Sequence, residues 1–268
     1  MFNELEIFLS QSKNRLATLD VMRKHLIEKF DLNNHSISLP TISRMVKRLS
    51  FSRKRVKKLA PRRNISLTLD KRQDVARKIL SYEKFGKEII YIDETGFNQQ
   101  MTPLYGYSKI GERCLVTTGL KGQNYSVIAA ITKSKILGYQ IIKGSIKADD
   151  FGAFIASLLN NNPNILKNRS QYIFFMDNAP IHKAKSLQPF FQNFNILFNA
   201  PYSPFLNPIE EFFGNWKHNF RKKFRENTVN IADKIVRAVQ EIDNALLYSF
   251  FMHSLSFLKD CLSRKPIL

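Results

Sequence analysis

The chain has 268 residues, 44% of them hydrophobic, and a formal net charge of +20. The length suits one large domain or a small domain before a larger one, and 22 phenylalanines supply a packed core, which excludes global disorder. No apolar run reaches the ~18 residues that span a bilayer, the N-terminus lacks a signal-peptide pattern, and the two cysteines have no metal-ligand spacing. We therefore expect a soluble intracellular protein whose cysteines are ordinary thiols.

The first 60 residues predict three short helices. Thr18 is placed to cap the second helix, and Ser38 with Pro40 opens the third. Apolar residues recur in the third helix at the spacing of one helical face. Its polar face carries Ser43, Arg44, Lys47 and Arg48. Three small helices with a basic last helix indicate a helix-turn-helix, whose final helix enters the major groove of DNA.

The positive charge is concentrated in the same region. Residues 1–64 hold 15 basic and 5 acidic side chains, which gives +10, half of the net charge. Residues 44–63 include ten basic residues and no acidic one, among them Arg53, Lys54 and Arg55. A polyanionic partner such as DNA is the natural interpretation. The blander alternatives are a generic helical bundle with a basic surface, a solvated linker, or a nuclear import signal.

Beyond the basic linker the elements alternate. The pattern predicts helices over residues 68–82, 149–159, 183–194, 209–224 and from 227 onward, and strands over residues 88–94, 124–132, 136–143, 172–176 and 196–199. The strands are mostly apolar, as in a sheet covered on both faces. The fold class is therefore mixed α/β with a central sheet.

Three acidic residues stand at informative places in that order. Asp93 is predicted to end the first strand, Asp177 ends a later strand, and Glu210 starts a helix. Ligands gather at the carboxyl ends of strands in α/β sheets, so the three side chains can converge. Such carboxylates can hold a pair of Mg²⁺ ions that activate one oxygen and stabilise another in phosphodiester chemistry.

Nearby polar residues allow two interpretations each. His182 contacts phosphate or a ligand carboxylate, or else it caps or packs a helix. Asn207 and Pro208 are helix-entry residues that aim Glu210. The last turns of the helix that follows carry a basic stripe that faces DNA or is simply solvated. This stripe consists of Lys217, Arg221, Lys222 and Lys223.

The strings DETGF at 93–97, MDNAPIH at 176–182 and PYSPFLNPIE with FFGNWK at 201–217 resemble mariner-type DDE transposases and their bacterial insertion-sequence relatives. The resemblance covers about residues 88–225 and implies a ribonuclease-H-like core with helices on both faces. It divides the chain into a helix-turn-helix domain and linker (1–64), a catalytic core (65–225) and a C-terminal helical extension (226–268).

Carried over by motif, the resemblance implies that Asp93, Asp177 and Glu210 are catalytic metal ligands. The interval of 32 residues between the last two is slightly shorter than usual in the family, so Glu211 stays an alternative third ligand. The family usually has two helix-turn-helix units and only one fits here. A truncated copy, a split reading frame or a later start codon would explain that.

The implied function is a DNA transposase that uses Mg²⁺, with Mn²⁺ as a substitute, and needs no nucleotide cofactor. It would cut DNA at the element's ends and join the 3′-hydroxyls to target DNA. Its partners would be terminal inverted repeats, TA-containing target DNA and a second copy of the chain, in a nucleus or a bacterial cytoplasm. The alternatives are a non-catalytic DNA-binding protein derived from such an enzyme, and a metal-dependent nuclease without strand transfer.

Overall fold

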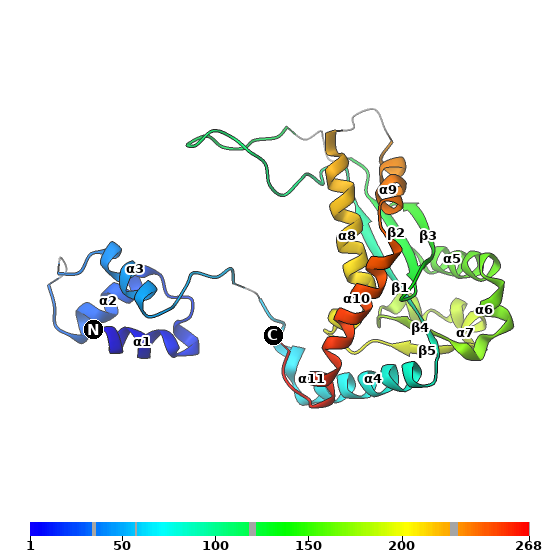
Figure 1. Cartoon of the computed structure of the whole chain (residues 1–268), viewed down its shortest axis with the longest axis horizontal. Helices are drawn as coiled ribbons and strands as arrows, with labels where there is room; N and C mark the ends of the chain where they lie inside the picture. The colour runs from blue at the N-terminus through cyan, green and yellow to red at the C-terminus, as the bar shows by residue number, and fades with distance from the viewer. Residues whose placement is uncertain (34–35, 57, 118–121, 226–229, 268) are drawn as a thin grey trace. The chain divides into compact units, whose positions relative to one another are not determined.

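The computed structural model describes residues 1–33, 36–56, 58–117, 122–225 and 230–267 (Figure 1). They belong to two compact units, Met1–Lys58 and Leu59–Leu268. Within the described residues, every helix is too short or too polar to cross a membrane.

The first unit is built from helices α1 (Phe2–Ser10), α2 (Leu19–Lys29) and α3 (Leu39–Arg48). The hydroxyl of Thr18 accepts a hydrogen bond from the backbone N–H of Val21, and that of Ser38 accepts one from Thr41, so both predicted caps are present. Such caps satisfy backbone donors that have no partner inside the helix. A small core fills the space between the helices: Leu5, Leu9, Met22, Leu26, Ile37, Ile42 and Met45.

The second unit contains a five-stranded sheet in the order β3-β2-β1-β4-β5. Its strands are β1 (Glu88–Phe97), β2 (Tyr125–Ile131), β3 (Ile136–Lys143), β4 (Tyr172–Met176) and β5 (Asn195–Phe198). β1, β2 and β3 pair antiparallel, whereas β4 pairs parallel to both β1 and β5. The carboxyl ends of β4 and β5 therefore point the same way as β1.

Helices cover both faces of this sheet (Figure 1). The unit contains α4 (Ser66–Lys84), α5 (Ala148–Asn161), α6 (Pro163–Lys167), α7 (Gln188–Phe191), α8 (Ile209–Lys222), α9 (Ile231–Gln240), α10 (Asn244–Ser256) and α11 (Leu258–Leu262). Alternate strand residues enter two separate cores. Ile90 and Ile92 pack with Phe151 of α5, while Ile89 and Tyr91 belong to the core that holds α4 and α8–α11. This two-sided burial explains why the strands are apolar throughout.

Two expectations about these elements are wrong. The predicted helix over residues 183–194 is mostly absent: only Gln188–Phe191 is α-helical, preceded by short 3₁₀ turns. Pro189 stands in the first turn of this short helix, and because proline disfavours helical backbone at the residue before it, the helix begins there instead of running through from residue 183. Asp93 does not end its strand either, because β1 continues to Phe97. Its pairing with β4 stops at Tyr91, and only β2 accompanies it further.

Candidate active site

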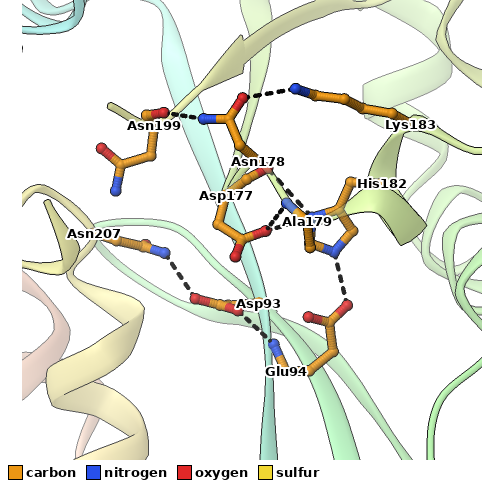
Figure 2. Close-up of polar contacts among 9 residues, drawn as sticks. All are labelled: Asp93, Glu94, Asp177, Asn178, Ala179, His182, Lys183, Asn199 and Asn207. Carbon is orange, nitrogen blue, oxygen red and sulfur yellow. Dashed lines mark hydrogen bonds and ion pairs between the residues drawn. The ribbon is translucent and has the colours of Figure 1, made fainter. Parts of the chain in front are cut away.

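Asp93 lies where β1 separates from β4. One carboxylate oxygen, Oδ1, accepts a hydrogen bond from the backbone N–H of Glu94 at 2.8 Å. The other, Oδ2, accepts one from the side-chain amide of Asn207 at 3.1 Å. Both oxygens are thus held from different parts of the chain, one by the strand itself and one by the segment that leads into α8 (Figure 2).

Asp177 follows β4 directly and is fixed by its own turn. Its Oδ1 accepts from the backbone N–H of Ala179 at 2.8 Å, and the Nδ1 atom of His182 lies 2.8 Å from the same oxygen. The opposite ring nitrogen of His182, Nε2, lies 2.8 Å from Oε1 of Glu94. Figure 2 shows His182 as a bridge between the two carboxylates. With its ring buried against Phe151, this histidine both packs and orients Asp177.

Burial and charge set the protonation of this group. Burial lowers the pKa of His182, but its hydrogen bonds with Asp177 and Glu94 outweigh burial and raise the pKa to about 10. The histidine is therefore a cation at neutral pH. Its hydrogen bond in turn holds the pKa of Asp177 below the usual range, so Asp177 stays ionised.

Asp93 behaves in the opposite way. Removal from water, followed by repulsion from Glu210, Glu94 and Asp177, raises its pKa to about 7, although the hydrogen bond from the Glu94 N–H acts against this rise. The pKa of Glu210 is also raised. Desolvation is the largest cause, Lys217 acts against the rise, and repulsion from Asp177 adds to it. Negative charge at this end of the sheet is thus incompletely balanced by the cations around it.

Asp93, Asp177 and Glu210 line one cavity of about 280 Å³. Glu210 stands on the first turn of α8 with its neighbour Glu211. Glu211 does not line this cavity, and its carboxylate bonds to His253 of α10. The cavity geometry therefore favours Glu210 over Glu211 as the third member of the group.

The segment between β5 and α8 forms one wall of the cavity, and Arg72 of α4 holds it. The fully buried guanidinium donates through Nε to the hydroxyl of Ser203 (2.7 Å) and through Nη2 to the carbonyl of Tyr202 (3.2 Å). It also donates to the Asn64 side chain (2.9 Å) and the Arg63 carbonyl (2.7 Å). Tyr202 has a positive φ of 53°, a conformation that costs energy in residues other than glycine. Arg72 thus fixes a strained turn beside the carboxylates.

The chemistry of the cavity suits a hard divalent cation. Its carboxylate oxygens are the donors that Mg²⁺ and Mn²⁺ prefer. The buried Oδ1 atoms of Asn199 and Asn207, which line the same cavity, accept no hydrogen bond among the described residues. As arranged, however, no three described His, Cys, Asp or Glu side chains meet closely enough to hold an ion. The carboxylates are thus of the right chemical kind for such an ion, but they line one cavity without meeting around one position.

The predicted DNA-binding side chains lie in the other unit. All seven are exposed: Ser43, Arg44, Lys47, Arg48, Arg53, Lys54 and Arg55. These seven residues belong to the unit Met1–Lys58, and the three carboxylates belong to the unit Leu59–Leu268. Sequence reasoning missed the bond of Asn207 to Asp93, the pairing of Glu94 with His182, and the role of Arg72. The Asn-Pro pair before the helix marked Asn207, but its partner is 114 positions away.

A comparison with protein families bears on this geometry. The family model described as DDE superfamily endonuclease matches residues 88–229, which include all three carboxylates. No curated protein sequence matches the chain.

Solved structures of Mos1 mariner transposase are similar to the whole chain. A pre-cleavage Mos1 transpososome matches with a TM-score of 0.76 at 17% identity, covering 100% of this chain and 79% of the other. A Mos1 paired-end complex with Mn matches at 0.71 and 18%, covering 99% and 79%. The Mos1 catalytic domain alone matches at 0.57 and 17%, covering 80% and 100%. The predicted fold, a ribonuclease-H-like core preceded by a helix-turn-helix domain, is confirmed by this likeness.

Proposed function

Because the chain belongs to the DDE superfamily of endonucleases, we propose that it is a mariner-type DNA transposase that cleaves phosphodiester bonds at the ends of a mobile element and joins the freed 3′-hydroxyls to target DNA. One observation carries the proposal. Asp93, Asp177 and Glu210 come from β1, the end of β4 and the start of α8, and they line the same cavity. Three acidic groups in one partly desolvated place are unfavourable unless a cation or a proton compensates them.

Asp93, Asp177 and Glu210 would hold two divalent ions, Mg²⁺ or Mn²⁺. When bound, such ions stabilise charge at the attacking and the leaving oxygen of a phosphoryl transfer. The relative Mos1 has been solved with Mg and with Mn, which supports this choice. Neither a nucleotide cofactor nor a covalent protein–DNA intermediate is required, since no side chain needs to attack phosphorus.

The chain's own residues position these groups. Asn207 and the Glu94 N–H hold both oxygens of Asp93, and His182 with the Ala179 N–H holds one oxygen of Asp177. Asp177 itself lines the cavity. Imidazolium at His182 keeps Asp177 ionised, while Asp93 must lose a proton before it binds a cation.

The basic first unit would bring DNA to this core. Exposed Ser43, Arg44, Lys47 and Arg48 on α3, with Arg53, Lys54 and Arg55 after it, would contact the terminal inverted repeats. The Mos1 relatives include a pre-cleavage transpososome, a paired-end complex with the left transposon end and a strand-transfer complex. By analogy, this chain would act as a homodimer on paired ends and insert at TA-containing targets, in a nucleus or a bacterial cytoplasm.

The test is a cleavage assay on duplex DNA that carries the inverted repeats flanking the gene, with Mg²⁺, Mn²⁺ or EDTA. We expect metal-dependent cutting that is lost in Asp177→Asn, while binding of the same DNA persists. Cleavage that survives Asp177→Asn would refute the catalytic assignment. Tight binding without any metal-dependent cutting would instead identify a non-catalytic DNA-binding protein, and cutting without end joining would identify a nuclease.

A further inference from the structure

Gly214 lies in the middle of α8 and has no packing reason to be glycine. The residue is exposed, and a Cβ atom built there would meet nothing within 4 Å in the described structure. Glycine is among the least favourable residues for a helix interior, because it loses the most backbone freedom on folding. The helix is otherwise well anchored by Phe212, Trp216 and Phe220. The destabilising residue therefore points to a requirement outside the described chain.

The neighbours of Gly214 on the helix surface are charged. With 3.6 residues per turn, Glu210, Lys217 and Arg221 lie four residues before, three after and seven after Gly214, on one strip. We call these four residues the Gly214 strip. Its first member lines the carboxylate cavity. Its two cations are half-buried rather than fully extended into solvent. The strip thus leads from the proposed metal site to a pair of positive charges.

Glycine permits a backbone or another polymer to approach a helix closely. Two cations beside the gap favour a polyanion over a second protein surface. Eleven residues of helix span about 16 Å, which matches about five nucleotides of a strand that rises 3.4 Å per residue. A sugar–phosphate backbone lying along the strip would reach the carboxylates at its Glu210 end.

We propose that the Gly214 strip is the surface against which the cleaved DNA strand lies beside the active site, with Gly214 at the closest approach of its backbone to α8. This inference rests on the proposed function, since it names how that site holds its substrate. Lys217 and Arg221 would contact phosphates, and Gly214 would leave open space between Glu210 and Lys217.

The decisive variant is Gly214→Ala, because it moves stability and DNA contact in opposite directions. The added methyl group meets no protein atom within 4 Å and alanine has a higher helix propensity than glycine, so the melting temperature should rise by about 2 °C. Affinity for a fluorescein-labelled duplex, measured by anisotropy in EDTA, should fall about tenfold, as expected for a misfit of one carbon. Gly214→Leu should weaken binding further.

Asn215→Ala is the matched control. It also raises helix propensity, but its side chain lies about 100° around the helix from Gly214. It should raise the melting temperature and leave affinity unchanged. The helix-turn-helix unit is identical in all variants, so differences among them report on the core.

The inference is overturned if Gly214→Ala and Gly214→Leu bind the duplex as well as wild type. It is also overturned if they change only the oligomeric state in light scattering, because the strip would then meet a protein. These readouts need no catalysis. If wild type does not cut DNA but Gly214→Ala still weakens binding, the proposed function fails while the surface assignment holds.

Discussion

The two units of this chain differ in how the residues proposed to act on DNA are arranged. In Met1–Lys58, the seven side chains predicted to bind DNA fall within residues 43–55, and all are exposed. In Leu59–Leu268, the acidic group is assembled from positions 93, 177 and 210 and is partly desolvated in a cavity. The first arrangement depends on local sequence and long-range charge, so salt should control it. The second depends on the folded sheet, so protons and metal ions should control it.

Asp93→Asn should have the largest effect, because it should reduce cleavage by the core and leave DNA binding by the first unit unchanged. Loss of a supporting residue around a metal ligand already costs about 10–100-fold, so loss of a ligand itself should cost at least about 100-fold in cleavage. Binding of end DNA should stay near wild type, because the first unit is unchanged. Gel-shift and cleavage assays on the same DNA measure both, and parallel loss of both activities would contradict the separation.

Arg72→Met should damage the core while sparing the first unit. It leaves the buried hydroxyl of Ser203 and the partly buried acceptors at Asn64 and Tyr202 without their charged donor, which should lower stability by roughly 3 kcal/mol. Denaturant unfolding measures this loss. Arg72→Lys restores the charge but not the fork of donors and should recover only part of it. An unchanged unfolding free energy would show that the segment before α8 is held by other contacts.

The triple variant Arg44→Ala, Lys47→Ala, Arg48→Ala tests DNA binding by the first unit. If each residue contacts one phosphate, the slope of log affinity against log salt should decrease in magnitude by about 2.7. Metal-dependent nicking of plasmid DNA at low salt should persist. Titrations at several salt concentrations provide the slope, and an unchanged slope would remove α3 from the interface.

Stability and metal affinity of the core should depend on pH through Asp93. The folded-state pKa of Asp93 is about 7, above its usual value of 3.8, so this group stabilises the metal-free fold below about pH 4 and that stability is lost as pH rises through 7. A cation must displace this proton below pH 7, so metal affinity should fall about tenfold per pH unit there. Mn²⁺ titrations at pH 6 and 7 measure the difference, which should vanish in Asp93→Asn.

The smallest expected effect lies at the helix caps of the first unit. Ser38→Ala removes the acceptor for the Thr41 N–H and should destabilise that unit by about 1 kcal/mol. Circular dichroism melts should detect it, with no change in cleavage by the core at low temperature. A larger loss would mean that Ser38 holds more than the first turn of α3.

Sequence patterns predicted most elements because period and capping are local properties. The strands at 136–143 and 172–176 have the predicted bounds, and Thr18 and Ser38 cap the predicted helices. The helix predicted at 183–194 is mostly absent because Pro189 allows a helix to begin near Gln188 but not to run through it.

The environment of the carboxylates was less accessible to sequence. That Asp93, Asp177 and Glu210 share a cavity was predicted from strand ends and motifs. Asp93 and Asp177 differ in the side chains that contact them. Asn207 contacts Asp93 from a position far away in the sequence, and His182 contacts Asp177 from the other side of a turn. No spacing rule could predict that Glu94, beside Asp93, pairs with His182. Arg72 carried no signal, since a lone arginine in a predicted helix reads as a surface residue.

We propose above all that Asp93, Asp177 and Glu210 together form the metal site of the core. The most direct test of this proposal is Mn²⁺ binding followed by electron paramagnetic resonance in wild type and in Glu210→Gln and Glu211→Gln. We predict that Glu210→Gln weakens binding and abolishes metal-dependent cleavage, whereas Glu211→Gln, which loses only its bond to His253, retains both. Normal binding and cleavage in Glu210→Gln, with loss in Glu211→Gln, would contradict this account.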